Sequence, residues 1–98
     1  MNTYERGQTV TLRIVWKDAA GALVDPSALT VQIKDPLGVA TQFTFGTDEE
    51  LIRDSQGNYH IDRDPSLQGR YNAKWQGTSG AKTGIVKDEF LVVEDFFD

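Results

Sequence analysis

His60 is the only histidine in this sequence of 98 residues. It is a candidate for acid–base chemistry, because a histidine side chain changes its charge near neutral pH. A catalytic histidine needs a reacting group within hydrogen-bond reach and usually an acid that orients its ring. The alternation with Tyr59 and Ile61 directs His60 to the opposite face, away from the core, and the sequence gives it no fixed partner. We therefore interpret His60 as a solvated strand residue, and we expect the protein not to be an enzyme.

Two clusters of carboxylates, residues 48–50 and 62–64, could in principle bind a cation. Calcium takes about six to eight oxygen ligands, but neither cluster has the spacing of a calcium-binding loop. Aspartate also favours turns, because its side chain bonds nearby backbone. The aspartates that precede turn signals are Asp18, Asp25, Asp35 and Asp54. We expect no cofactor or metal, with a structural calcium site as the alternative.

The stretch GTSGAKTG, residues 77–84, contains the residue types of a phosphate-binding loop. Its spacing differs from that of a phosphate-binding loop, and no helix follows it. We interpret it as a hairpin loop whose exposed residues could contact a partner.

The composition argues against several classes of partner. There is no cysteine, which excludes thiolate-based zinc and iron–sulfur sites. The formal net charge is −5, and the ten Lys and Arg residues are scattered, so we expect neither nucleic-acid nor membrane binding. The first ten residues lack the basic start and apolar core of a signal peptide. These features favour a domain that stays in the cytoplasm or joins a particle assembled there.

Residues alternate between apolar and polar along most of the chain, with turn signals in between. No segment has the period of about 3.6 residues that marks a helix. The expected strands cover residues 8–16, 29–33, 40–45, 51–54, 59–61, 69–75 and 84–93. In the last of these, Asp88 falls in phase with core positions, which requires a bulge or a place at the rim. We predict an all-β, immunoglobulin-like (Ig-like) antiparallel β-sandwich of about seven strands over residues 1–94.

The segment QGRYNAKW, residues 68–75, supports this fold class. Gly69 permits a tight entry into a strand, and Tyr71 and Trp75 then face the core. In Ig-like sandwiches, a tyrosine at such a place bonds its hydroxyl back to the backbone just upstream, which is called a tyrosine corner. We expect Tyr71 to do so.

The C-terminal end, residues 95–98, forms a short acidic and aromatic tail beyond the last strand. Exposed aromatic residues commonly anchor in a partner's pocket. The alternatives are that Phe96 and Phe97 pack back on their own domain, or that the tail is disordered. The partner-binding residues predicted on this basis are Tyr4, Glu94, Asp95, Phe96, Phe97 and Asp98.

The order of these motifs resembles the small Ig-like domain proteins of tailed bacteriophages and prophages. The resemblance covers residues 7 to 94, and its residues belong to turns and core. The matching positions are Gly7, Val10, Leu12, Asp18, Gly21, Asp25, Pro26, Val31, Ile33, Asp35, Pro36, Gly38, Gly57, Tyr59, Gly69, Tyr71, Trp75, Phe90 and Val92.

The resemblance implies a structural virion component, since such proteins are typically encoded among head and tail morphogenesis genes. A head–tail neck protein, a tail accessory protein and a capsid decoration protein are all open. The implied partners are other virion proteins, with self-association possible in principle, and the implied location is the virion, assembled in the bacterial cytoplasm. The alternative is a carbohydrate- or host-surface-binding Ig-like module, for which Phe43, Phe45 and Tyr59 would have to be exposed.

Overall fold

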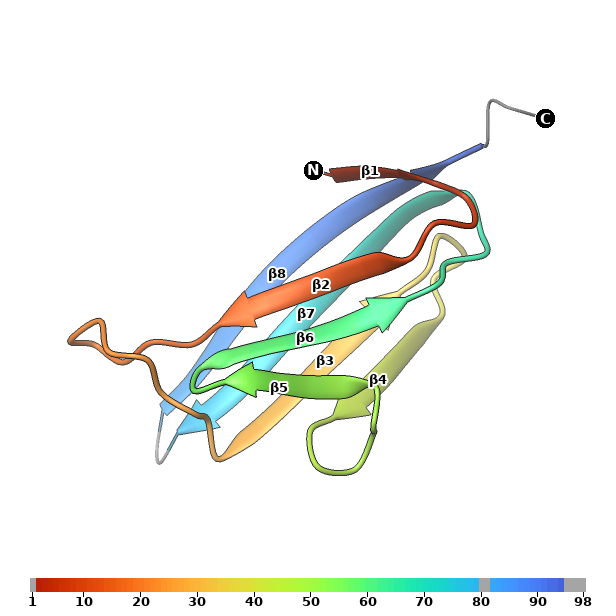
Figure 1. Ribbon diagram of the computed structural model, residues 1–98. Coiled ribbons are helices and arrows are strands. Elements are labelled where there is room, and N and C mark those ends of the chain that lie inside the picture. Colours follow the sequence, from red (N-terminus) through yellow and green to blue (C-terminus); the bar gives the residue numbers. More distant parts are fainter. Residues whose placement is uncertain (1, 80–81, 95–98) are drawn as a thin grey trace.

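The seven alternating segments and one further segment at the N-terminus form eight strands, which pack as a β-sandwich in the computed structural model (Figure 1). The structure describes residues 2–79 and 82–94. The strands are β1 (Asn2–Glu5), β2 (Val10–Val15), β3 (Ala28–Lys34), β4 (Ala40–Thr44), β5 (Leu51–Ser55), β6 (Asn58–Arg63), β7 (Gly69–Ser79) and β8 (Lys82–Val93). The predicted fold class is confirmed. Within the described ranges there is no helix, and therefore none long and apolar enough to cross a membrane.

The strands divide into a sheet of five, in the order β1-β8-β7-β3-β4, and a sheet of three, in the order β2-β6-β5. All pairings are antiparallel except one: β1 runs parallel to β8, from Asn2 opposite Phe90 to Glu5 opposite Val93. This strand was not expected. Its four residues contain a single apolar side chain, Tyr4, which is too little to show an alternation.

The core lies between the two sheets and draws one residue in two from most strands. In β2, for example, Val10, Leu12 and Ile14 are buried, and the residues between them are exposed. Fifteen hydrophobic residues are buried in the described part of the chain, and among them Trp75 is 1% exposed and Phe90 2% exposed. Burial of such side chains stabilises the fold by about 1.5–3 kcal/mol each.

The tyrosine corner predicted at Tyr71 is confirmed. The Tyr71 hydroxyl donates to the carbonyl oxygen of Leu67 at 3.0 Å, and the Leu67 N–H donates to the hydroxyl at 3.2 Å. The ring stacks on Phe90 with 4.9 Å between ring centroids. Gly69 enters the strand with a φ of 131°, and a Cβ there would lie 2.8 Å from Pro36. Only glycine suits this position, since it tolerates both the conformation and the contact.

Asp88 takes the rim position rather than a bulge. The pairing of β7 with β8 runs without a register shift from Gly69 opposite Val92 to Ser79 opposite Lys82. Phe90 and Val92 are buried, whereas Val86 and Asp88, in the same phase, are exposed. The first part of β8 therefore extends beyond the region where the three-stranded sheet covers the core.

Candidate interaction surface

Two of the residues predicted to bind a partner, Tyr4 and Glu94, lie where β1 meets the end of β8 (Figure 1). The Tyr4 ring packs edge-on against Phe90, with 5.8 Å between centroids. Arg6 forms an ion pair of 2.6 Å with Glu94, and the Arg6 N–H donates to the Val93 carbonyl. Tyr4 and Glu94 thus contact their own domain. The other predicted residues, Asp95, Phe96, Phe97 and Asp98, lie outside the described residues, and the partner-binding role of the whole set stays a prediction.

Next to this cluster, a long stretch of β8 has a strand on one side only. Strand β1 pairs with β8 at residues 90–93, while β7 pairs with it along the whole length from residue 82. Residues 82–89 therefore form a free edge with respect to the described strands, which we call the β8 edge. Ile85 and Val86 lie in its middle and are 54% and 40% exposed. An edge of this length presents unpaired backbone donors and acceptors to a partner.

The sequence predicted a strand here but not its exposure. The order of strands in a sheet depends on long-range pairing, which the alternation of residues does not encode. One signal was present, however. Asp88 is a charged residue in the phase of the buried residues Phe90 and Val92. The structure shows that this part of β8 lies at the rim, outside the core.

His60 faces outward, as predicted, but it has a partner that the sequence did not reveal. Its Nδ1 lies 2.8 Å from the Asp54 carboxylate, and its Nε2 lies 4.0 Å from Asp62. The Arg13 guanidinium lies 3.6 Å from the same Asp54 carboxylate. The described residues contain no group of three or more side chains that could hold a metal ion. This arrangement ties three neighbouring strands together on the outer face of the smaller sheet.

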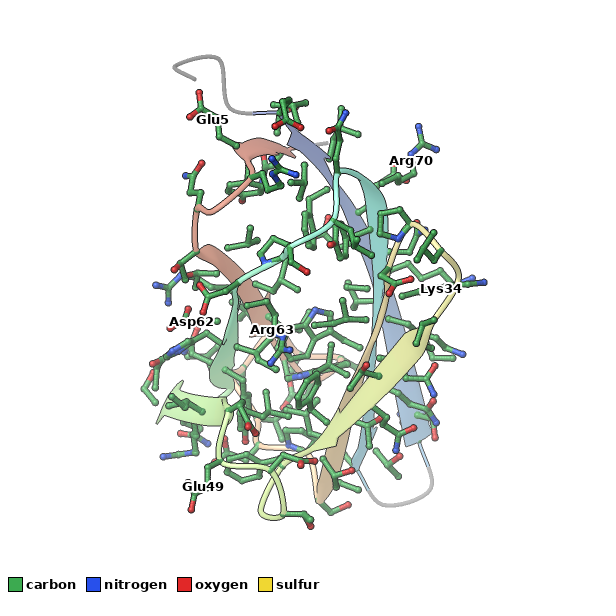
Figure 2. The ribbon with its side chains drawn as sticks, turned by 90° about the vertical axis from the view of Figure 1, so that its right-hand side faces the viewer. Glu5, Lys34, Glu49, Asp62, Arg63 and Arg70 are labelled. Atoms are coloured by element: carbon green, nitrogen blue, oxygen red, sulfur yellow. The ribbon has the colours of Figure 1, made fainter. Side chains whose placement is uncertain are left out.

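The other carboxylates mostly stabilise loops and strand pairs. Asp18 and Asp35 each accept bonds from two backbone N–H groups of their own turn, as expected for turn aspartates. Asp62 and Asp64 instead accept a hydroxyl bond of 2.6 Å from Thr11 and Thr9, respectively, on the neighbouring chain segment. Figure 2 shows Asp62 pointing away from the sandwich, while its neighbour Arg63 lies between the layers.

Asp25 and Asp54 differ from the turn aspartates, and the role expected for each was wrong: Asp54 contacts His60 and Arg13, as described above. Asp25 has a larger set of partners. Its carboxylate accepts two bonds from Arg53, one from the Gly57 N–H and one from the Tyr59 hydroxyl, rather than bonds from its own turn. The Arg53 guanidinium, with further donation from Gly57 and Tyr59, holds the pKa of Asp25 well below its usual range. Burial, followed by the bond to Asp25, raises the pKa of Tyr59.

Two of the concave sites in the described part of the chain lie beside aromatic side chains. One, of about 310 Å³, lies beside Trp16, between the loop after β2 and the β7–β8 hairpin. The indole ring packs on two glycines, Gly77 and Gly84, where an added Cβ would come within 3.0 and 2.8 Å of ring carbons. The other, of about 180 Å³, contains Arg63, whose guanidinium lies 4.6 Å from the centre of the Phe43 ring.

The aromatic residues that a glycan-binding face would require are not gathered at the surface. Phe43 and Tyr59 are buried, at 7% and 2% exposure. Phe45 is half-exposed and packs edge-on against Tyr59, with 5.2 Å between centroids. Of the three aromatic residues considered for such a face, Phe45 alone can contact a ligand.

Three solved structures share this fold. An endo-β-1,4-mannanase from Thermotoga petrophila matches 97% of the chain with a TM-score of 0.61 and 20% identity. A putative glycoside hydrolase from Bacteroides vulgatus matches 99% with a TM-score of 0.62 and 16% identity. CopC from Methylosinus trichosporium OB3b matches 95% of the chain with a TM-score of 0.61 and 23% identity. The match covers 83% of the length of CopC. The chain spans only 18% and 17% of the two hydrolase chains.

No protein-family model matches the sequence, and no curated protein matches it. The chain is thus a small β-sandwich module whose fold resembles CopC and domains found within glycoside hydrolases. None of the three is a phage protein, so the relation to phage Ig-like proteins stays a prediction.

Proposed function

We propose that this domain is a structural component of a tailed-phage virion, and that it acts by binding other proteins rather than by catalysis. The observation that carries the proposal is the β8 edge, where residues 82–89 lack a strand on one side within the described part of the chain. A partner strand that adds to such an edge gains backbone hydrogen bonds together with side-chain contacts on both faces.

The engagement of the ionisable side chains supports a role without chemistry. His60 bonds Asp54, and Asp25 bonds Arg53 and Tyr59, so these groups hold loops and strands together. The contact with Asp54 alone would also suit a catalytic histidine, but the Nε2 of His60 faces Asp62 at 4.0 Å, and neither concave site described above includes His60. The chemistry-bearing residues that the sequence offered have structural partners instead.

The virion location is supported by the resemblance of the sequence pattern over residues 7 to 94. In a symmetric particle, many copies engage at once, and an interface that is weak in isolation gives stable attachment. In that setting the β8 edge and the terminal residues predicted to bind a partner need to supply only a weak contact per copy.

The test is sedimentation of the native protein from a lysate of its source through a density gradient, with detection by antibody. Co-migration with intact particles in a fixed ratio to the capsid protein would support the proposal. The copy number per particle would then separate capsid decoration from a neck or tail role. Recovery in the light soluble fractions alone would overturn the virion assignment.

A carbohydrate- or host-surface-binding module is the second candidate. The pocket beside Trp16, with its largely apolar lining, favours it, as does the fold shared with domains of two glycoside hydrolases. Titration with soluble glycans, monitored by tryptophan fluorescence, tests this candidate. A saturable change, together with calorimetric binding that is lost in Trp16→Ala, would establish glycan binding at that pocket, whereas our main proposal expects no binding in either measurement.

A further inference from the structure

The β8 edge is free along residues 82–89 but is not protected in the usual way. Natural edge strands often carry charges, especially lysines, that repel a second edge. Here the charges have both signs: Lys82 stands at one end, and Lys87, Asp88 and Glu89 give the other end a net negative charge. Between them lie the exposed apolar residues Ile85 and Val86. A stretch with opposite charges at its two ends is complementary to an antiparallel copy of itself.

We propose that two copies of this chain pair through their β8 edges, antiparallel and about a two-fold axis at Ile85. The two five-stranded sheets then join into one continuous sheet. This inference rests on the proposed protein-binding function and deepens it, because it names the partner of the edge as a second copy.

Symmetry restricts the possible registers. A two-fold axis perpendicular to the sheet brings together residues from the same face, and side chains alternate between faces with a period of two. The axis must therefore lie midway between the two copies of one residue, so that this residue opposes its own counterpart. With the axis at Ile85, Lys82 of each copy lies opposite Asp88 of the other, and Ile85 lies opposite its own counterpart.

The neighbouring registers fit less well. An axis at Val86 would bring residue 82 opposite Phe90, which already pairs with Asn2 of β1. An axis at Gly84 would leave Lys87 and Asp88 outside the paired segment. The axis at Ile85 ends the pairing at residue 88, two residues before the first residue paired with β1. It therefore uses the free segment without displacing β1.

The two charges are also free to pair between copies. Among the described residues neither Lys82 nor Asp88 forms a salt bridge, and both side chains are exposed; Oδ1 of Asp88 accepts the backbone N–H of Glu89 at 2.8 Å, which leaves Oδ2 for a partner. They lie six residues apart on one strand, a separation of about 20 Å, so they cannot contact each other within one copy. Any coupling between these two positions must therefore act between molecules.

Sedimentation velocity over a range of concentrations tests the proposal on the purified chain. We expect a reversible dimer with a dissociation constant of roughly 10 μM to 1 mM, since an edge pairing buries less area than a standard interface. Lys82→Asp and Asp88→Lys should each weaken it by about tenfold or more, because each places like charges opposite each other twice. The double variant Lys82→Asp/Asp88→Lys should restore it. Lys34→Asp makes an equal charge change at an exposed position of β3 and is the matched control. This variant should dimerise as the wild type does.

A second measurement does not depend on the charge variants. The chain has no cysteine, so Ile85→Cys introduces a single thiol at the axis. Opposed residues in an antiparallel pair have Cα atoms about 4.5–5.5 Å apart, which suits a disulfide. Mild oxidation should cross-link this variant but not Val39→Cys, whose residue is exposed at a distant hairpin.

Three results would overturn the proposal: a monomer up to about 1 mM, a dimer unaffected by either single reversal, or weakening that the double variant does not reverse. These outcomes are separate from those of the particle experiment. A monomer that co-sediments with particles would refute the paired edge and leave the virion role intact. A dimer found only in soluble fractions would support the paired edge and refute the virion role.

Discussion

The hydroxyl of Tyr59 donates a hydrogen bond of 2.9 Å to Oδ1 of Asp25, and this bond joins the buried strand β6 to the loop between β2 and β3. The same oxygen accepts the Gly57 N–H at 2.9 Å, and Arg53 binds both carboxylate oxygens. A single carboxylate thereby fixes the loop against the hairpin of β5 and β6. These four hydrogen-bond donors favour the ionised carboxylate of Asp25, which can only accept hydrogen bonds.

Stability should consequently fall in acid, and Asp25 should account for part of the fall. A carboxylate whose pKa is lowered by folding stabilises the native state above its ordinary pKa, near about 4, and loses that contribution as the pH drops below it. Asp25→Asn should be less stable than the wild type at pH 7, with a smaller further loss toward pH 3. Urea unfolding across this pH range measures both effects. Glu49→Gln, at an exposed loop position, should keep the wild-type slope; an equal slope in Asp25→Asn would contradict the prediction.

Tyr71→Phe should lower the free energy of unfolding by about 1–2 kcal/mol. The phenyl ring keeps the stacking on Phe90, but the Leu67 carbonyl and N–H lose the hydroxyl that satisfies them. Chemical denaturation compares the variant with Tyr4→Phe, since the structure records no hydrogen bond from the Tyr4 hydroxyl to a described residue. A loss of equal size in both variants would mean that the corner bond itself contributes little.

The tyrosine corner was foreseeable because its parts lie close together in the sequence. A glycine, a tyrosine two residues later and the period of two determine the strand, its face and the direction of the hydroxyl. The role of Asp25 was not foreseeable in this way. Its donors lie 28 to 34 residues away, and only the pairing of strands brings them to the same carboxylate.

Strand neighbours account for the other differences. The parallel pairing of β1 and the free edge of β8 both follow from which strands are adjacent, and the predicted strand lengths contain no such information. The contact of His60 with Asp54 spans only six residues, but it depends on how β5 pairs with β6, where the register shifts between Arg53 and Ser55. Local pattern thus predicted the fold class and the core, whereas the surfaces available for binding required the structure.

Gly84→Ala should destabilise the domain by about 1–3 kcal/mol, because overpacking forces a neighbour to move. The added methyl group would lie 2.8 Å from Cζ3 of Trp16. Displacement of the indole ring should increase its quenching by acrylamide, which fluorescence measures alongside unfolding. Thr83→Ala, one residue earlier and exposed, should change neither property appreciably. An unchanged Trp16 environment in Gly84→Ala would contradict the packing described above.

Deletion of residues 95–98 should abolish association with particles and leave the fold intact. The last described strand ends at Val93, and its partners lie on β7 and β1, so the unfolding free energy should stay within about 0.5 kcal/mol of the wild type. Circular dichroism and denaturation test the fold, and gradient co-sedimentation tests attachment. Loss of folding would show instead that the tail belongs to the domain.

The parallel pairing of β1 with β8 has a mechanical consequence. When β1 is pulled backward from Asn2 and β8 forward from Val93, the two strands slide along each other, and the bonds between them are stretched together. An antiparallel terminal pair would open one bond at a time, like a zipper, at lower force. Single-molecule pulling should find a first rupture at higher force in the whole domain than after removal of residues 2–5. The sandwich is thereby suited to withstand tension applied along the chain.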